Sequence, residues 1–262
     1  MTGRPCRRQS APLGLRLSAS QLDQFEQYAA LLVSWNQRLN LTRVVDPTGI
    51  AIRHLADSLA VAAVWQPAGP AMLVDVGSGA GLPGLPLKIL WPALTLTLIE
   101  AVGKKAAFLE AVVGALGLSG VRVVAGRAEE AGQQPALREQ FDLALARGVA
   151  PLPVLVELVL PLVRLGGQAV LHQSRTASAA LATAQAAITL LGGSPATVYP
   201  APLPALPHHD LVAIAKVAPT PAAYPRRPGL PAQRPLGGAP SRAARQGQPP
   251  RPHAAAGVAH RC

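Results

Sequence analysis

Apolar residues follow two different patterns along the chain. In the first quarter they recur at helical spacing, and Leu22 and Phe25 fall on the buried face of a helix expected over 18–41. A second helical pattern covers 48–64. From residue 71 onward, short apolar runs alternate with helical patterns, and such runs are typical of strands buried on both faces. The chain therefore predicts a helical leader followed by an α/β domain.

The α/β part has a regular order of expected elements. Strands are predicted at 72–76, 94–99, 121–125, 141–146, 167–172 and 211–217, with a short one near 197–199, and helices near 83–90, 104–117, 151–164 and 176–191. This alternation predicts a parallel sheet covered by helices on both faces, with ligands at the carboxyl ends of its strands. Pro161 lies inside the third of these helices, so we expect a kink or an early end there.

A glycine-rich turn follows the first expected strand. Gly77, Gly79 and Gly81 alternate with small residues before the next helix begins. A strand, a glycine turn and a helix start together present free N–H groups to an anionic or nucleotide-like ligand. Glu100 ends the second strand, where a carboxylate can accept hydrogen bonds from ribose hydroxyls. The turn therefore predicts a nucleoside site.

Two kinds of nucleoside ligand fit this turn. Gly79, Gly81 and Gly84 match the dinucleotide pattern G-x-G-x-x-G, which is a weak signal by itself. The register Asp75-x-Gly77-x-Gly79-x-Gly81 fits better, because it resembles that of Rossmann-like S-adenosylmethionine-dependent methyltransferases. Both kinds of protein use an acid such as Glu100, so that residue does not choose between them.

The charge of the chain is concentrated at its two ends. The 262 residues carry a net charge of +11, and the flanks at 1–17 and 219–262 hold eleven arginines and no acid. The body between them is neutral. A basic arm on a neutral body suggests a polyanionic partner such as RNA or DNA. For residues beyond 237 a solvated tail rich in arginine and proline is the alternative.

Several protein classes do not fit the composition. No apolar run approaches the ~20 residues of a membrane span, and the arginine-rich start lacks the apolar core of a signal peptide. Cys6 and Cys262 make neither a disulfide framework nor a metal site. We therefore expect a cytoplasmic protein with no metal and no membrane partner.

Seven short motifs occur in an order that resembles one family. They are Asn36-x-x-x-Asn40-Leu-Thr42, Arg53-His54-x-x-Asp57-Ser58, Asp75-Val-Gly-Ser-Gly-Ala-Gly-Leu-Pro-Gly84, Gly103-Lys-Lys-x-x-Phe-Leu109, Gly126-Arg-Ala-Glu-Glu130, Ala146-Arg147 and Tyr224-Pro-Arg-Arg-Pro-Gly229. From about Leu22 to Leu236 the chain closely resembles the bacterial 16S ribosomal RNA guanine-N7 methyltransferases, once called glucose-inhibited division protein B. The resemblance implies a Rossmann-like class I fold, S-adenosylmethionine as cofactor, methyl transfer to guanine N7, and ribosomal RNA or the small ribosomal subunit as partner. We expect a monomer.

The resemblance also implies the residues of the cofactor site. Family positions that contact the cofactor match Gly77, Leu82, Glu100, Ala101, Val102, Ala128, Glu129 and Arg147. In the family, the positions that match Gly77 and Leu82 lie against the methionine and ribose of the cofactor. The acid that matches Glu100 faces the ribose and adenine, and the pair that matches Ala128 and Glu129 brackets the adenine. One departure is that relatives commonly carry Leu-Lys-Gly after the fifth strand, where this chain has Leu171-His172-Gln173. If that lysine holds RNA in relatives, the role here is weakened or passes to His172 or Arg175.

The chain is expected to divide into five parts. They are a basic flexible N-terminus at 1–17, the helical leader at 18–70, the methyltransferase domain at 71–218, a segment rich in tyrosine, proline and arginine at 219–236, and a disordered tail at 237–262. In the fourth part, Arg226, Arg227 and Arg234 are predicted to contact RNA phosphates, with Tyr224 stacking on a base. The alternative is a docked tail held by Tyr224 and Leu230.

Residue types narrow the acceptor atom of the expected methyl transfer. Methylation of a pyrimidine carbon-5 needs a cysteine nucleophile, and both cysteines lie in the flanks. Amino methylation of adenine usually shows an Asn/Asp-Pro-Pro-aromatic run after the fourth strand, where this chain reads Ala146-Arg147-Gly-Val-Ala-Pro151. Guanine N7 has an in-plane lone pair and no proton to remove. Alignment would then suffice, and no catalytic residue is expected.

Other interpretations of these residues stay open at the level of sequence. Arg147 could form a salt bridge with Asp142 or Glu129, and His54 could brace the leader. A small-molecule methyltransferase, a nicotinamide-dependent oxidoreductase and a non-enzymatic RNA-binding protein are the alternative functions. Equilibrium binding separates the second, because the Asp75 register predicts affinity for S-adenosylmethionine and none for NAD.

Overall fold

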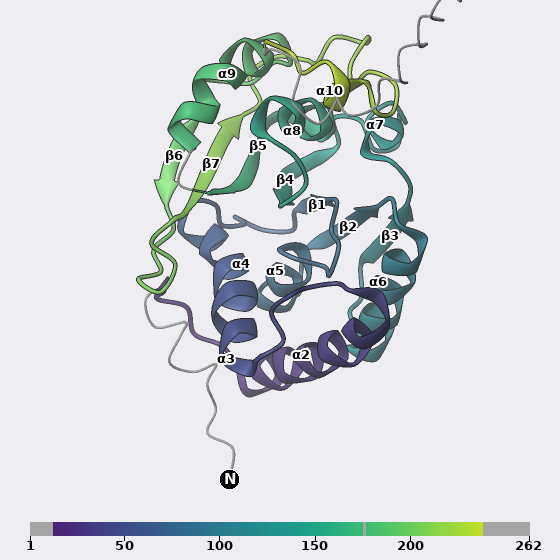
Figure 1. The fold of residues 1–262 in the computed structure, drawn as a ribbon, viewed down its shortest axis with the longest axis vertical. Coiled ribbons are helices and arrows are strands. Elements are labelled where there is room, and N and C mark those ends of the chain that lie inside the picture. Colours follow the sequence, from purple (N-terminus) through teal and green to yellow (C-terminus); the bar gives the residue numbers. More distant parts are fainter. Residues whose placement is uncertain (1–12, 175–176, 238–262) are drawn as a thin grey trace, which may run out of the picture.

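The centre of the protein is a seven-stranded sheet with strand order β3-β2-β1-β4-β5-β7-β6 (Figure 1). We describe residues 13–174 and 177–237 from a computed structural model of the chain. The strands are β1 (Met72–Val76), β2 (Thr95–Glu100), β3 (Val121–Ala125), β4 (Phe141–Arg147), β5 (Val163–Ser174), β6 (Thr197–Pro200) and β7 (His209–Ala215). The expectations of a flexible start and a disordered tail fall mostly on 1–12 and 238–262, which lie outside the described residues.

The sheet is only partly parallel. Strands β1 to β5 pair in parallel, whereas β7 runs antiparallel to both β5 and β6. The prediction of a parallel sheet is therefore correct for the first five strands and wrong for the direction of β7. The connection from β6 to β7 covers only 201–208, and a parallel crossover needs a dozen or more residues. As a result, the first residue of β7 arrives at the edge where the parallel strands end.

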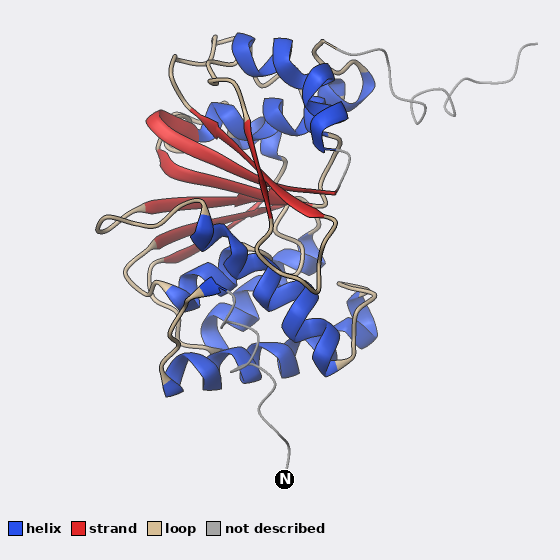
Figure 2. Cartoon of the chain, turned by 90° about the vertical axis from the view of Figure 1, so that its left-hand side faces the viewer, coloured by secondary structure: helices blue, strands red, loops and turns tan. Residues whose placement is uncertain are grey.

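Helices cover both faces of the sheet (Figure 2). One face carries α2 (Ala19–Leu39), α3 (Pro47–Gly49), α4 (Asp57–Leu59), α5 (Gly84–Leu90) and α6 (Gly103–Ala115). The other carries α7 (Ala128–Ala131), α8 (Leu152–Val159), α9 (Ala177–Leu190) and α10 (Leu230–Gln233). Each layer buries its own apolar cluster against the sheet, so the expected layered fold is confirmed.

The leader begins as expected and then departs from a regular helix. Ser18 and Gln21 form a reciprocal capping box at the start of α2, whose buried face includes Phe25 and Tyr28. The single helix predicted over 48–64 is instead α3, a π-helical stretch over Ile50–Ala56, α4, and a 3-10 turn over Ala60–Ala63. Irregular turns of this kind occur often at functional sites. Here the π-helical stretch carries Arg53 and His54, and Asp57 follows as the first residue of α4.

The helix that contains Pro161 ends early, as predicted. Helix α8 stops at Val159, and a 3-10 turn over Leu160–Leu162 leads directly into β5. A proline ring removes an N–H and clashes with the preceding helical turn. Strand β5 therefore begins at Val163, four residues before the expected start, and it is long enough to pair with β4 on one side and β7 on the other.

Candidate active site

The glycine turn after β1 has a backbone that other residues rarely adopt. Gly77, Gly79 and Gly81 have φ angles of +67°, +57° and +88°. A Cβ added at Gly77 would lie 2.6 Å from a methyl carbon of Val149, whereas one added at Gly79 would find its nearest atom 3.8 Å away. The turn is therefore closely covered on one side and open on the other, as a backbone cradle for a ligand requires.

Glu100 connects this turn to the end of β2. One carboxylate oxygen accepts the N–H of Gly79 and the other accepts the N–H of Val102, each at 2.8 Å. A carboxylate oxygen has more than one acceptor position, so each can still receive a hydroxyl. Ala101 and Val102 are exposed beside it. This arrangement fits a ribose, and three of the predicted cofactor contacts, Glu100, Ala101 and Val102, lie together here.

Asp75, at the start of the motif, lies beneath the turn. It is fully buried, and one oxygen accepts the N–H of Gly84 at 2.9 Å. The other oxygen has no hydrogen-bond partner among the described residues. Burial raises the pKa of Asp75 to about 7. Because it holds the first residue of α5, Asp75 supports the turn from behind.

A small pocket lies next to the turn on the side of α7. Its volume is about 80 Å³, and its lining includes Gly77, Ala101, Ala128 and Glu129, all predicted cofactor contacts. Val149, from the loop after β4, also lines it. Leu82 differs from these residues, because it is buried in the apolar cluster of the leader face. Its predicted contact with the cofactor stays a prediction.

The carboxylate of Glu129 is held in place at this pocket. Its Oε1 atom accepts hydrogen bonds from the Arg127 guanidinium and from the N–H of Gly229, each at 3.0 Å. Burial raises the pKa of this carboxyl, but the bonds from Gly229 and Arg127 outweigh that effect and lower it below its usual value. Glu129 is therefore ionised at neutral pH.

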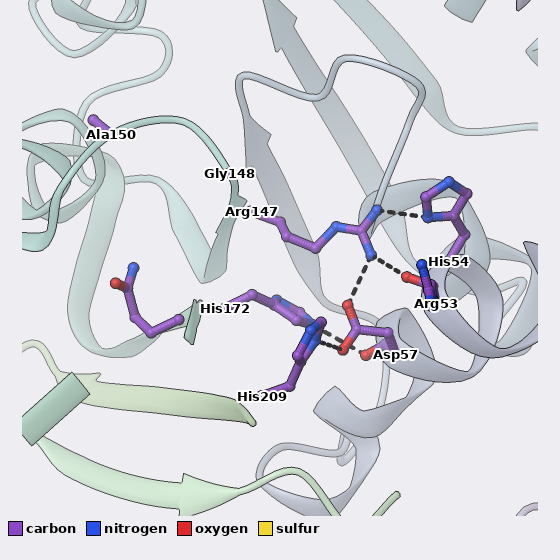
Figure 3. A pocket seen from close by; sticks show the side chains of 9 residues that line it. Arg53, His54, Asp57, Arg147, Gly148, Ala150, His172 and His209 are labelled. Carbon is purple, nitrogen blue, oxygen red and sulfur yellow. Dashed lines mark hydrogen bonds and ion pairs between the residues drawn. The ribbon is translucent and has the colours of Figure 1, made fainter. Parts of the chain in front are cut away.

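A second, larger cavity of about 400 Å³ is shown in Figure 3, and its lining includes Gly148 and Ala150, the neighbours in sequence of Val149. We call the charged and imidazole side chains in its lining the Asp57 cluster, and its members are Arg53, His54, Asp57, Arg147, His172 and His209. The Arg147 guanidinium donates to Asp57 Oδ2 at 2.7 Å and to the backbone carbonyl of Arg53 at 2.9 Å. The same guanidinium lies 3.3 Å from His54 Nδ1. Arg147 thus joins the end of β4 to the leader.

Two further histidines reach Asp57 from β5 and β7. His209 Nδ1 lies 2.9 Å from Asp57 Oδ1, and His172 Nε2 lies 3.1 Å from the Asp57 backbone oxygen. A carbonyl can only accept, so Nε2 of His172 carries the proton. Figure 3 shows these side chains converging on Asp57 from separate elements. The cluster therefore forms only when β4, β5, β7 and the leader are all in place.

The cluster has a definite charge. Burial alone would raise the pKa of Asp57, but the bonds from His209 and Arg147 lower it to about 2. The hydrogen bond between His209 and Asp57 raises the pKa of His209, whereas burial lowers the pKa of His172 and of His54. The lining of the cavity thus holds two guanidinium groups against a single carboxylate, together with a histidine whose pKa is raised. The cavity favours an anionic ligand.

The structure corrects the salt bridges considered for Arg147. Its carboxylate partner is Asp57, while Asp142 pairs with Arg164 and Glu129 pairs with Arg127. The motif Arg53-His54-x-x-Asp57 was a visible signal for half of this cluster. His54 does brace the leader, since its Nε2 lies 2.8 Å from Thr42 Oγ1, but it also lines the cavity.

The two histidines of the cluster that come from β5 and β7 differ in how far the sequence predicted them. His209 was missed, and nothing local distinguishes it. His172 was considered as a replacement for the usual lysine, and it does line the cavity. Arg175, the other candidate for that role, lies outside the described residues.

The three arginines predicted to bind RNA differ in their surroundings. Arg226 makes a two-point ion pair with the buried carboxylate of Glu157, whereas Arg227 and Arg234 are exposed. Tyr224 is half-buried and packs against the apolar cluster of the α8 face. The docked-tail interpretation therefore describes Arg226 and Tyr224, and RNA binding by the three arginines stays a prediction.

Membrane spans and metal centres are both absent from residues 13–174 and 177–237. None of the helices there is both long and apolar enough to cross a membrane. In the same part of the chain, no group of three or more histidine, cysteine or acidic side chains is placed to hold a metal ion.

The sheet order, the glycine turn and the acid at the end of β2 define the class I S-adenosylmethionine-dependent methyltransferases. Among solved structures, a point mutant of MtNAS matches with a TM-score of 0.51, 18% identity and coverage of 76% of both chains. MtNAS in complex with MTA and tNA matches with a TM-score of 0.50 and 15% identity, over 72% of this chain and 71% of that one. At such low identity these structures support the fold alone.

The family is shown by sequence. The model described as rRNA small subunit methyltransferase G matches residues 21–201, and the chain belongs to this family. A ribosomal RNA small subunit methyltransferase G from Roseiflexus castenholzii is 50% identical over 223 residues, which are 85% of this chain and 95% of that protein. One from Geobacillus kaustophilus is 41% identical over 224 residues, with 85% and 94% coverage. The predicted family is confirmed, S-adenosylmethionine is its cofactor, and the nicotinamide alternative is set aside.

Proposed function

We propose that the protein transfers the methyl group of S-adenosylmethionine to N7 of a guanine in 16S ribosomal RNA, as naked RNA or within the small subunit. One observation supports this most directly. The loop after β4 lines both cavities, since Val149 lines the small pocket while Gly148 and Ala150, with Arg147 at the end of β4, line the large one. A base held in the large cavity would therefore meet the cofactor across this loop.

The residues of the small pocket fit the cofactor that the family uses. The open face of Gly79 and the two oxygens of Glu100, at the turn beside the pocket, suit a ribose, and the lining by Ala128 and Glu129 suits the adenine joined to it. When bound there, S-adenosylmethionine supplies an electrophilic methyl group on a sulfonium. The protein's part is to orient that group and to exclude water from it.

The large cavity suits an acceptor that needs no proton removed. Guanine N7 attacks through an in-plane lone pair, so a general base is unnecessary. Asp57 could not serve as one, because its pKa of about 2 makes it a weak proton acceptor and both oxygens are bonded. The guanidinium groups instead offer donors for the guanine O6 edge or for phosphates.

The charge of the cavity favours RNA over a small neutral acceptor. Arg53 is exposed at its rim, and the His209 side chain is 43% exposed, so both are available to a backbone phosphate. Arg227 and Arg234 add exposed charge on the C-terminal side. The proposal takes the protein as a cytoplasmic monomer that acts on ribosomal RNA.

A methyl-transfer assay tests this function. Labelled S-adenosylmethionine is offered with small ribosomal subunits, with naked 16S RNA and with a panel of small nucleosides. We expect the label in one guanine of the RNA. Reduction of the N7-methylated base followed by cleavage of the RNA chain at that site then maps its position. Label in an exocyclic amino group, in another base, or only in the nucleosides would contradict the proposal.

A further inference from the structure

The C-terminal segment, residues 219–237, is bonded to the face of the sheet that carries α7 and α8 (Figure 1). The family model ends at residue 201, so it does not cover this segment. Arg138 donates to the carbonyls of Thr220 at 2.7 Å and Tyr224 at 2.6 Å, and the Gln133 amide donates to that of Pro225 at 2.8 Å. These hydrogen bonds hold the segment on the side of the sheet where the small pocket lies.

The strongest attachment of the segment is one ion pair. Glu157 of α8 is completely buried, and its two oxygens accept Nε and Nη2 of Arg226 at 2.8 and 2.5 Å. The N–H of Arg226 donates to the same carboxylate at 2.9 Å. Such a carboxylate needs all of these donors, because an unpaired buried charge is very unfavourable. Arg226 therefore has a buried structural partner, whereas its neighbour Arg227 is exposed.

The attachment reaches the small pocket by two routes. Three residues after Arg226, Gly229 donates its N–H to Glu129, which lines that pocket. Gly229 has a φ of +82°, a conformation in which a residue with a side chain would be strained. The direction of its N–H depends on how the segment docks. In addition, Leu158 lines the pocket and directly follows Glu157 in α8.

We propose that Arg226 is a positioning residue for the cofactor, because its pair with Glu157 docks the C-terminal segment so that Gly229 fixes the Glu129 carboxylate at the pocket. This inference rests on the proposed cofactor site. It gives Arg226 a task different from that of its neighbour Arg227. Losing Arg226 should weaken cofactor binding even when no RNA is present, whereas losing a phosphate contact should weaken only RNA binding.

The test compares Arg226→Ala with Arg227→Ala in the full chain. Calorimetry measures the affinity of each for S-adenosylhomocysteine without RNA, and kinetics give kcat and separate KM values for cofactor and RNA. We expect Arg226→Ala to raise the cofactor Kd and KM about tenfold, as for a lost hydrogen bond to a charged group. The kcat should change little. Arg227→Ala should leave the cofactor Kd unchanged and raise the KM for RNA.

Two further variants guard against simple misfolding. Arg226→Lys keeps the charge but not the fork of donors, so it should restore part of the affinity. The double change Glu157→Gln with Arg226→Gln removes both charges together, which avoids a buried unpaired carboxylate, and it should weaken cofactor binding as Arg226→Ala does.

The outcomes separate the two proposals. Parental cofactor affinity in folded Arg226→Ala or in the double variant would overturn the positioning role, and an effect on RNA alone would return Arg226 to the phosphate contacts. A parent protein that binds no S-adenosylhomocysteine would instead contradict the proposed function.

Discussion

The two cavities at the carboxyl edge of the sheet are built in opposite ways. The small pocket is lined by small and apolar residues, such as Gly77, Ala101 and Val149, and by the carboxylate of Glu129. Glu100 lies at the turn beside it, and both glutamates accept backbone N–H groups. The large cavity consists of side chains, in which arginines and histidines surround Asp57. The first arrangement suits a ligand with hydroxyls and a fixed shape. The second suits a charged ligand that approaches from solvent.

The difference shows how one sheet edge can serve two ligands at once. The glycine turn has backbone angles that other residues rarely adopt, so the small pocket should tolerate little change. Side chains of the Asp57 cluster share one carboxylate, so the loss of any member redistributes the others. The two cavities should therefore fail independently of each other.

The largest effect is expected from Gly77→Val. The branched side chain would collide with Val149 and would adopt a φ of +67°, which β-branched residues avoid. Calorimetry should detect no S-adenosylmethionine binding, while RNA affinity is retained. Gly117→Val is the matched control, because Gly117 has a φ of +61° with open space around it. Near-normal cofactor affinity in Gly77→Val would remove the turn from the site.

Asp57→Asn should damage the other cavity. Arg147 would lose its buried carboxylate, so we expect a stability loss of about 3 kcal/mol in urea unfolding and slow methyl transfer. Cofactor affinity should stay close to that of the parent. The control is Asp142→Asn, whose partner Arg164 is half-exposed, and such a pair contributes about 0–1 kcal/mol. Equal losses in the two variants would mean that the cluster is not specially stabilised.

The two buried aspartates should respond to pH in opposite directions. The folded pKa of Asp75 is about 7 and exceeds its ordinary value of 3.8, so its contribution to stability is full in acid and declines between about pH 4 and 7. The folded pKa of Asp57 is about 2, so its contribution is present above about pH 4 and is lost as the pH falls towards 2. Unfolding of Asp75→Asn should lack the first decline, of about 1 kcal/mol per pH unit. An unchanged pH profile would show that Asp75 ionises normally.

The smallest effect concerns the exposed arginines of the C-terminal segment. The double variant of Arg227→Ala and Arg234→Ala should bind RNA more weakly and with a shallower salt dependence. The slope of log affinity against log salt should fall by roughly 0.7 for each phosphate that an arginine no longer neutralises. RNA affinity measured at several salt concentrations gives this slope, and cofactor binding serves as the control. Parallel lines for parent and variant would exclude both residues as phosphate contacts.

These cavities also differ in how far the sequence predicted them. The small pocket follows from a contiguous motif at 75–84 and an acid at the end of the next strand, so local spacing and family resemblance located it. Asp57, Arg147, His172 and His209 come from four separated segments. His209 enters because β7 is antiparallel, and strand direction depends on which connections are too short for a crossover. No local sequence pattern predicts the direction of β7.

The fold was also predictable in part, since its strands were predicted and its irregular turns were not. Each strand expected over 72–172 exists within a few residues, because continuous apolar runs bounded by glycine and proline are strong signals. The irregular turns at 50–63 were not foreseen, since π and 3-10 stretches carry the same apolar spacing as an α-helix over so few residues. The pairing of Arg226 with Glu157 depended on where the last segment crosses α8.

The bond between Asp57 and His209 joins residues 152 positions apart, which has a consequence for the order of events during synthesis. The leader and the first four strands leave the ribosome long before β7 exists. Over that interval Asp57 has Arg147 as a partner but not His209, and the small pocket has its glycine turn but not the N–H of Gly229 on Glu129. A nascent chain should therefore complete both cavities only near the end of its synthesis, and an enzyme that modifies ribosomal RNA would become competent for its substrate only once its own translation is nearly complete.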